Sequence, residues 1–191
     1  MTVRPAVATD IDTLSATLAE AFQPDPVMSW CYPDTPERAQ ILPESFRVIL
    51  DAALPYGGVE TAEEGAAASI WIPPGAEIDN ERLAADLGTV SGPYTERAFT
   101  LMGLLDEHHP TEQEHQYLLA LGTRDAWQSR GLGSALLRSV LSRCDVDGVP
   151  AYLEATSERN RLLYERHGFE VVDVLHLPDG PPLWSMWRTP R

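Results

Sequence analysis

A short glycine-containing segment in the last third of the chain has the composition of an anion-binding site. It follows a predicted strand and reads Gln128-Ser129-Arg130-Gly131-Leu132-Gly133-Ser134. Glycines let the backbone approach a ligand closely, and the N–H groups of a helix's first turn carry a partial positive charge that suits a pyrophosphate. Two glycines before a helix are also common in ordinary turns, so the segment alone leaves a packing role open.

Two nucleotide-binding motifs of similar appearance can be excluded at this segment. A P-loop ends in lysine followed by serine or threonine, and no Gly-Lys-Ser/Thr follows these glycines. The dinucleotide-binding fingerprint needs a third glycine where Leu136 stands, and it usually opens a fold, whereas this segment lies in the last third of the chain. The segment therefore predicts an anion site of another kind.

A second segment lies downstream of the first and carries Asn160, Tyr164 and the pair Gly168-Phe169. It resembles the Asn-x-x-x-Tyr-x-x-x-Gly-Phe motif of the GNAT acyltransferases. The first segment resembles the same family's cofactor motif, Gln/Arg-x-x-Gly-x-Gly/Ala. Two ordered motifs at the family's usual separation are far more specific than either one, and together they cover roughly residues 115–177.

Within the GNAT superfamily, the chain is most similar to actinobacterial small-molecule acetyltransferases of the puromycin N-acetyltransferase type. The shared features are Pro5 before a capped first helix, the Leu-Gly start at Leu121, a Leu-Glu-x-Thr segment at Leu153 and a Pro-x-Gly-Pro-x-x-Trp tail from Pro178. The resemblance implies an α/β (α+β) GNAT fold, with a mixed central sheet, helices on both faces and a splayed pair of strands. It also implies transfer of an acetyl group from acetyl-CoA to an amine by direct attack in a ternary complex.

The resemblance further implies where acetyl-CoA lies. The backbone of Leu121, Gly122 and Thr123 would meet the pantetheine arm, and Asn160 would bond the arm farther along. Gln128 would add hydrogen bonds beside the pyrophosphate. The residues expected to hold the pyrophosphate are Ser129, Arg130, Gly131, Leu132, Gly133 and Ser134. For Asn160 a second interpretation stays open, that of a helix-start residue near Ser157.

Two side chains are expected to carry the chemistry. An amine must be neutral to attack a thioester, so a carboxylate is useful as a general base, and Glu154 faces away from Leu153 along a strand. A tyrosine can protonate the departing thiolate, and Tyr164 occupies the family's position for that acid. The alternatives are a water relay in place of Glu154, and a core role for the Tyr164 ring with its hydroxyl bonded elsewhere.

Other reactive side chains are left out of the predicted site. His108, His109 and His115 lie near Pro110, where a loop role is commoner than a catalytic one. Cys31 and Cys144 are far apart and lack metal-ligand spacing, so we expect free thiols and no metal site.

The elements that must position these residues follow from hydrophobic periodicity. The last third predicts strand, helix, strand, helix, strand and strand at 116–121, 131–144, 151–155, 158–167, 169–177 and 183–187. Upstream, the pattern predicts a short strand near Val3, helices at about 9–22 and 35–54, hairpin strands at 58–61 and 66–72, and weaker helices at 79–88 and 94–109. Residues 23–36, rich in proline and aspartate, predict a loop. This order indicates a mixed sheet with helices on both faces.

The length of 191 residues predicts one domain, 1–191. Given the resemblance, residues 1–114 would form mainly the acceptor side and residues 115–177 the acetyl-CoA core. No apolar run approaches the roughly 20 residues needed to span a bilayer, and the N-terminus lacks a secretory signal pattern. We therefore expect a cytoplasmic protein without a membrane partner.

The net charge of −15 lies entirely in the upstream part of the chain. Residues 1–120 contain 5 arginines and 20 acids, whereas residues 121–191 contain 9 of each. A charge of this sign repels phosphate backbones, so we expect no nucleic-acid partner. The acidic part is either a solubilising surface or a surface that attracts a cationic substrate.

Three functions fit these observations. The first is N-acetylation of a small-molecule amine, which an enclosed pocket behind the helices at 79–109 would favour. The second is acetylation of a protein N-terminus or lysine, which needs an open groove. The third is a non-catalytic acetyl-CoA sensor. The C-terminal residues Trp184, Met186 and Trp187 are expected either in the core or at a homodimer interface.

Overall fold

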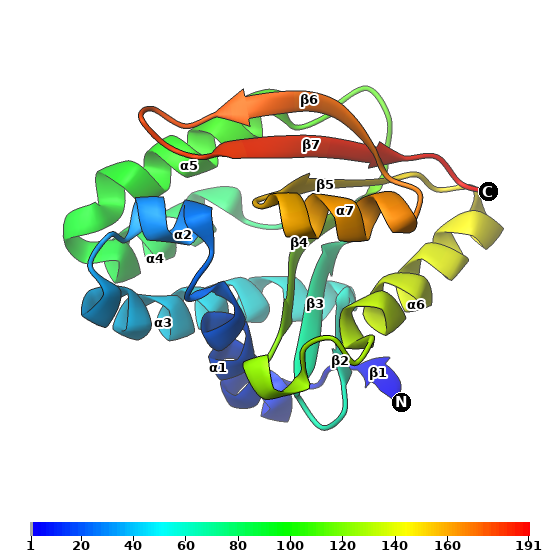
Figure 1. Cartoon of the computed structure of the whole chain (residues 1–191), viewed down its shortest axis with the longest axis horizontal. Helices are drawn as coiled ribbons and strands as arrows, with labels where there is room; N and C mark the ends of the chain where they lie inside the picture. Colours follow the sequence, from blue (N-terminus) through cyan, green and yellow to red (C-terminus); the bar gives the residue numbers. More distant parts are fainter. Residues whose placement is uncertain (1) are drawn as a thin grey trace.

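The computed structural model describes residues 2–191 and contains a mixed sheet of seven strands with helices on both faces (Figure 1). The strands are β1 (Val3–Pro5), β2 (Val59–Ala62), β3 (Ala67–Ile72), β4 (Gln116–Thr123), β5 (Ala151–Ala155), β6 (Glu170–His176) and β7 (Pro182–Arg188). Their order in the sheet is β1-β2-β3-β4-β5-β7-β6. Only β4 and β5 pair in parallel, and every other neighbouring pair is antiparallel.

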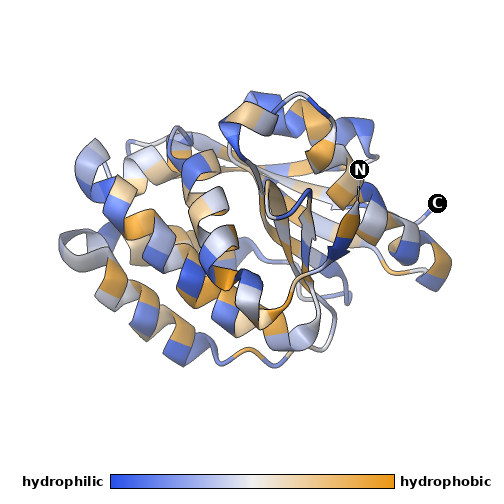
Figure 2. Cartoon of the chain, turned by 90° about the horizontal axis from the view of Figure 1, so that it is seen from below, coloured by the Kyte–Doolittle hydropathy of each residue, from blue (hydrophilic) through white to orange (hydrophobic). Residues whose placement is uncertain are grey.

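Two helical layers enclose this sheet. The helices are α1 (Ile11–Phe22), α2 (Pro26–Cys31), α3 (Thr35–Ala53), α4 (Asn80–Ser91), α5 (Thr95–His108), α6 (Leu132–Asp147) and α7 (Glu158–Arg166). Residues of α1 and α3 pack with one face of the central strands, and residues of α6 and α7 pack with the other. Figure 2 shows apolar and polar residues alternating around these helices, as expected where each helix buries one side.

The predicted mixed sheet with helices on both faces is confirmed, and most predicted elements differ from the observed ones only at their ends. The prediction was wrong for 23–36, which contains helix α2 where a loop was expected. The Asp25 carboxylate accepts hydrogen bonds from the backbone N–H groups of Val27 and Met28 and so caps this helix. Pro26 occupies the first helical position, where a missing N–H costs nothing. An Asp-Pro pair therefore starts a helix in a segment whose prolines suggested a loop.

A bulge in β4 produces the predicted splayed pair of strands. Ile70 of β3 pairs with Ala120, and Trp71 pairs with Leu118, so Leu119 is an extra residue on β4. On the other edge, β4 pairs with β5 only as far as Leu118 and Leu153. From Leu119 onward, β4 has no strand partner on its β5 side, and the sheet opens there.

Helix α1 packs closely against the splayed end of β4. A side chain at Gly122 would place its Cβ 2.9 Å from Ala21 Cβ and 2.9 Å from Leu18 Cδ2. Only glycine allows the helix to approach this near, so Gly122 fixes the distance between α1 and the opening.

Three further expectations concern the rest of the chain. Cys31 and Cys144 are buried and unpaired. Met186 lies in the core, while Trp184 and Trp187 are partly exposed. Within residues 2–191, no helix has the length and apolar character needed to cross a membrane.

Candidate functional site

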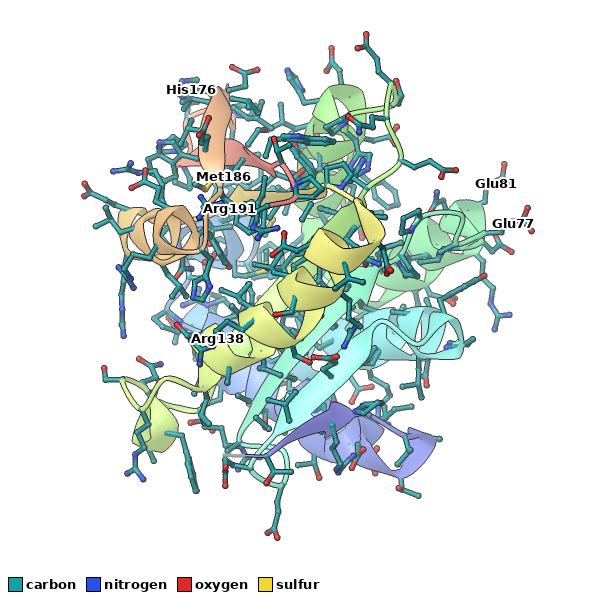
Figure 3. The ribbon with its side chains drawn as sticks, turned by 90° about the vertical axis from the view of Figure 1, so that its right-hand side faces the viewer. Glu77, Glu81, Arg138, His176, Met186 and Arg191 are labelled. Carbon is teal, nitrogen blue, oxygen red and sulfur yellow. The ribbon has the colours of Figure 1, made fainter. Side chains whose placement is uncertain are left out.

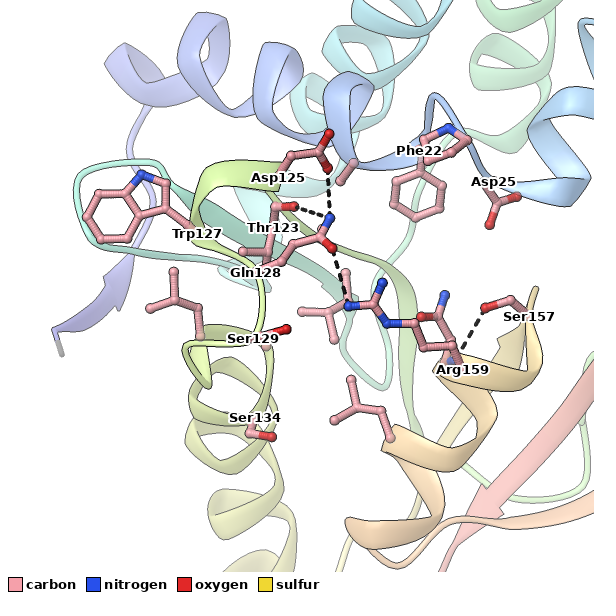
Figure 4. A pocket seen from close by; sticks show the side chains of 18 of the residues that line it. Phe22, Asp25, Thr123, Asp125, Trp127, Gln128, Ser129, Ser134, Ser157 and Arg159 are labelled. Atoms are coloured by element: carbon pink, nitrogen blue, oxygen red, sulfur yellow. Dashed lines mark hydrogen bonds between the residues drawn. The ribbon is translucent and has the colours of Figure 1, made fainter.

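A large pocket lies at the opening between β4 and β5 (Figure 4). Its volume is about 720 Å³. The walls come from the end of α1, the turn before α2, the end of β4, the turn that precedes α6, and one side of α7. The two segments singled out in the sequence therefore face each other across a single cavity.

The first segment forms a cradle of backbone N–H groups at the start of α6. Ser129 and Gly131 both have left-handed backbone, with φ of 60° and 82°, and they turn the chain sharply into the helix. The N–H groups of Leu132 and Gly133 belong to the first helical turn, where no earlier carbonyl can accept them. The predicted residues that line the pocket here are Gln128, Ser129, Gly131, Leu132, Gly133 and Ser134. Such a cradle suits a phosphate group.

Gly133 leaves free space in the pocket itself. A Cβ at this position would lie 3.7 Å from Leu121 Cδ2 and 3.9 Å from Leu163 Cδ2, both ordinary contacts. Both leucines also line the pocket. The fold therefore does not need a glycine here, and the missing side chain keeps open the space between two walls.

The positive charge of the pocket comes from residues that the sequence analysis missed. The side chain of Arg130 stacks on the Trp127 ring, 5.0 Å from its centroid, and Arg130 does not line the pocket. Arg159 and Arg166 of α7 do line it. Arg159, Leu163 and Arg166 are spaced four and three residues apart and therefore lie on one face of α7. Helical periodicity through the second motif would have identified this face as the one that lines the pocket.

A side-chain bridge crosses the pocket between the cradle and α7. The Arg159 guanidinium donates to the Gln128 side-chain oxygen over 3.3 Å, and the Gln128 amide donates to Asp125 over 2.8 Å (Figure 4). These two hydrogen bonds hold the Gln128 side chain in one orientation at the pocket wall.

Both interpretations of Asn160 are compatible with its position. Its backbone N–H donates to the Ser157 hydroxyl over 3.2 Å, which caps α7. Its side chain lines the pocket and makes no hydrogen bond to a residue within 2–191. The helix cap uses the backbone alone, and the amide group remains free for a ligand.

Tyr164 lies at the wall of the pocket with its ring packed edge-on against Phe169, the ring centroids 6.0 Å apart. The side chain is 7% exposed, and its hydroxyl forms no hydrogen bond to any described residue. Burial, and secondly the nearby Asp25 carboxylate, raise the pKa of Tyr164 well above its ordinary value. The ring thus belongs to the core, while the hydroxyl is not bonded to the protein.

Asp25 is a pocket carboxylate that the sequence analysis did not identify. It is 7% exposed and accepts hydrogen bonds from Val27 N–H at 2.9 Å, Met28 N–H at 3.0 Å, and the Thr156 hydroxyl. Burial raises the pKa of Asp25, and these hydrogen bonds oppose that rise. Because Thr156 directly follows β5, Asp25 joins the turn before α2 to the far side of the opening.

Glu154 lies on the opposite face of the sheet from Tyr164. Leu153 packs in the same cluster as Tyr164, and strand alternation turns Glu154 the other way. Tyr117 donates its hydroxyl hydrogen to Glu154 Oε2 over 2.8 Å, while Oε1 is buried without a partner among the described residues. Burial raises the pKa of Glu154 to about 7, although the hydroxyls of Tyr117 and Tyr152 hold it down.

The structure therefore does not bring all predicted site residues together. Glu154 is not among the residues that line the pocket, whereas Tyr164 and Asn160 are. The histidines also stand apart from the pocket lining: His109 and His115 pack against the Tyr152 ring, and His108 contacts a carbonyl of its own helix.

Comparisons with known proteins agree with this geometry. The acetyltransferase (GNAT) domain family matches residues 87–171. An uncharacterised N-acetyltransferase of Schizosaccharomyces pombe is 27% identical over all of this chain and 84% of its own.

Solved structures resemble the chain over nearly its whole length. A Corynebacterium glutamicum protein described as histone acetyltransferase HPA2 and related acetyltransferase is 27% identical, with a TM-score of 0.73 over 100% of this chain and 96% of its own. The polyamine N-acetyltransferase of Drosophila melanogaster, which forms N-acetylagmatine, is 17% identical, with a TM-score of 0.66 over 98% of this chain and 99% of its own. The chain has the α+β GNAT fold and is a GNAT N-acetyltransferase. GNAT enzymes use acetyl-CoA.

The pKa of Glu154 predicts a pH dependence of stability. Its pKa rises from an ordinary 4.5 to about 7 on folding, so the folded state holds the proton more tightly than the unfolded chain. The free energy of unfolding should therefore fall as the pH rises from 4.5 to 7, by about 3 kcal/mol at most. Glu154→Gln removes this ionisation, so its stability relative to the wild type should rise over the same range.

Urea unfolding at pH 5 and pH 8 measures this difference. Glu107→Gln, at an exposed position on α5, is the matched control and should follow the wild type at both pH values. Parallel pH profiles for the wild type and Glu154→Gln would show that Glu154 titrates normally in the folded protein.

Proposed function

We propose that this GNAT N-acetyltransferase transfers the acetyl group of acetyl-CoA to the amine of a small cationic molecule, by direct attack while both substrates are bound. One observation carries the proposal. A single pocket joins the N–H cradle at the start of α6 to the opening between β4 and β5, and Tyr164 lines it. Release of thiol from acetyl-CoA in the presence of a panel of amines tests it.

The pocket fits the parts of acetyl-CoA. The cradle from Ser129 to Ser134 would accept the pyrophosphate, and Arg159 and Arg166 supply the positive charge beside it. The edge of β4 that faces β5 lacks a strand partner between Leu121 and Thr123, so the sheet leaves its peptide groups available to the amides of the pantetheine arm. The Thr123 carbonyl also accepts a long hydrogen bond, of 3.4 Å, from the Gln128 side chain. The Asn160 side chain is available for the same arm.

The two faces of the sheet would serve the two substrates. The cofactor would occupy the face of α6 and α7, with its thioester at the opening. The amine would approach from the other face, on which Glu154 lies. The helices α1 and α3, from the acidic upstream part of the chain, pack on that face. Residues 1–114 would thus form mainly the acceptor side of one domain, and residues 115–177 the acetyl-CoA core.

Glu154 is the proposed base, acting directly or through a water molecule. Its pKa of about 7 lies near the pH at which it must accept a proton from an ammonium group. One of its oxygens has no partner among the described residues, whereas both oxygens of Asp25 already accept hydrogen bonds. Asp25 remains the competing base, because it lines the pocket beside Tyr164.

Tyr164 is the proposed acid. Its raised pKa keeps the phenol protonated at neutral pH, so it is ready to donate a hydrogen bond to the sulfur as the carbon–sulfur bond breaks. Of the two protons that the ammonium nitrogen loses, one goes to the base and one ends on sulfur through Tyr164. A backbone N–H on the open edge of β4 would polarise the thioester carbonyl while the carbon–nitrogen bond forms.

A small cationic amine is the proposed acceptor. The whole net charge of −15 lies within residues 1–120, and such a surface attracts cations. The fold is shared by the Drosophila melanogaster enzyme that forms N-acetylagmatine, so it accommodates a cationic substrate. An aminonucleoside is one such amine, which the resemblance of the segment 178–184 to the puromycin type supports.

A second candidate is acetylation of a protein lysine or N-terminus. It is favoured by the description of the Corynebacterium glutamicum relative as a histone acetyltransferase. Assay of small amines against lysine-containing and N-terminal peptides separates the two, and turnover of peptides alone would replace the first proposal. Binding of acetyl-CoA without turnover of any amine would favour a sensor.

Gly133 gives a test of the cofactor position. Gly133→Ala should leave coenzyme A affinity nearly unchanged, because its methyl group fits at 3.7 and 3.9 Å from Leu121 and Leu163. Gly133→Leu should weaken binding at least about tenfold, since its longer side chain fills the pocket that the two leucines enclose. Calorimetric titration measures affinity, and thermal unfolding shows that both variants fold.

Gly131 is less suitable for this test, because its φ of 82° would strain any other residue. Equal coenzyme A affinity for the wild type and Gly133→Leu would place the cofactor elsewhere.

Replacement of Tyr164 tests the acid. Tyr164→Phe keeps the ring packed on Phe169 and removes only the hydroxyl, so kcat should fall by roughly 100-fold to 10,000-fold. Because this hydroxyl makes no hydrogen bond to a described residue, stability and coenzyme A affinity should stay nearly constant. Single-turnover rates and melting temperature on one preparation measure both effects. An unchanged rate with a lower melting temperature would assign Tyr164 a structural role.

The pH profile of kcat separates the two carboxylates. With Glu154 as base, activity should rise with pH through about 7 as its carboxyl ionises. Glu154→Gln should lose this rise together with roughly 100-fold or more of the rate. Asp25→Asn should retain the rise. The reverse pattern would make Asp25 the base. If both variants keep the rise, neither carboxylate is the base, and a water relay without Glu154 would replace this assignment.

A further inference from the structure

A histidine outside the pocket contacts a residue that lines it. His167 directly follows α7, and its Nε2 lies 3.0 Å from the hydroxyl oxygen of Ser134. Ser134 belongs to the first turn of α6 and lines the pocket, whereas His167 does not. The Ser134 hydroxyl therefore connects His167 to the pocket.

The position of His167 is fixed from the other side of its backbone. Its carbonyl accepts a hydrogen bond from Arg188 Nε over 2.9 Å. Arg188 is buried on β7 and pairs with Asp145 of α6 over 2.8 Å. The backbone at His167 is thus held in place by a network that joins α6, α7 and β7.

Positive charges face His167 from every element around it. They are Arg138 on α6, Arg166 at the end of α7 and Arg188 on β7. The Arg191 guanidinium lies against the neighbouring Gly168, and Figure 3 shows Arg138 and Arg191 on the same side of the molecule. The carboxylate in this group, Asp145, is occupied by Arg188 and by the backbone N–H of Arg191.

The surroundings of His167 favour its neutral form. Burial first, and then the three arginines, lower the pKa of His167 from its ordinary value. A neutral imidazole can either donate to the Ser134 hydroxyl or accept from it. When the imidazole accepts, the Ser134 hydroxyl hydrogen points toward His167 and cannot be donated to a ligand in the pocket.

A bound phosphate would change this balance. Its negative charge favours the protonated form of a nearby histidine and partly offsets the repulsion from the arginines. An imidazolium can only donate, so Ser134 must accept from it and is then free to donate its own hydrogen to the phosphate.

We propose that His167 is a positioning residue of the phosphate site, which takes up a proton as a phosphate of coenzyme A binds and so turns the Ser134 hydroxyl toward it. This inference rests on the proposed cofactor function. It adds that cofactor binding and protonation are coupled, so affinity strengthens as the pH falls.

Calorimetric titration between pH 5.5 and 8.5 tests this coupling. Coenzyme A and dephospho-coenzyme A are each titrated in two buffers of different ionisation enthalpy, which gives the number of protons taken up. Dephospho-coenzyme A lacks the phosphomonoester, whose own pKa of about 6 would otherwise titrate in this range. Uptake with both ligands that His167→Gln loses would place the pyrophosphate beside Ser134, and uptake with coenzyme A alone that His167→Gln loses would place the 3′-phosphate there.

Three variants sharpen the test. His167→Gln keeps a side-chain N–H donor for Ser134 but cannot titrate, so its affinity should lose the pH dependence that the wild type shows. That dependence is up to about tenfold for each unit by which the ligand raises the histidine pKa. Ser134→Ala should reduce both affinity and proton uptake. His176→Gln, at an exposed position at the end of β6, should behave as the wild type.

Equal proton uptake by the wild type and His167→Gln would overturn the proposal. If His167→Gln does not fold, the ring nitrogen resonances of the wild-type histidines decide instead, because one imidazole should become protonated when dephospho-coenzyme A or coenzyme A is added at pH 7. Absence of that change would overturn it too. If neither coenzyme A nor dephospho-coenzyme A binds at any pH, the proposed cofactor function is refuted instead.

Discussion

The structure depends on one extra residue in β4. Because Leu119 is inserted between the pairs that Leu118 and Ala120 make with β3, pairing between β4 and β5 stops at Leu118. If β4 and β5 stayed paired to their ends, both edges of β4 would be hydrogen-bonded and the sheet would have no opening between its two faces. The bulge opens the sheet locally while β3 still holds the other edge of β4 as far as Thr123, so the opening has rigid walls.

Two contacts keep this opening at a defined width. Gly122 lets α1 lie directly against the free part of β4, where any Cβ would collide with Leu18 and Ala21. On the opposite side, Asp25 accepts hydrogen bonds from the first turn of α2 and from Thr156, which follows β5. The opening is therefore spanned by elements distant in sequence, and the pocket needs the end of α1 and the turn before α2 to complete it.

The parts of the site predicted from sequence are those encoded locally. Gly131, Gly133 and Tyr164 stand in short motifs, and the helices that present them show clear periodicity. Asp25 was missed because its role comes from long-range contact with Thr156, although the Asp-Pro pair is itself a helix-start signal. The bulge at Leu119 was also beyond reach, since a register shift depends on the partner strand and not on the residue type.

The environment, and not the residue types, sets the proton-carrying states on the two faces of the sheet. Burial raises the pKa of Glu154 to about 7, so near neutral pH this carboxyl exchanges a proton readily. Burial and the Asp25 carboxylate raise the pKa of Tyr164, so the phenol keeps its proton over the same range. The sequence alone shows only that residue 154 has a carboxyl group and residue 164 a phenol group, and not what their pKa values are. Only the fold places one beside two tyrosine hydroxyls and the other beside a buried carboxylate, which is how the two groups acquire separate protonation states.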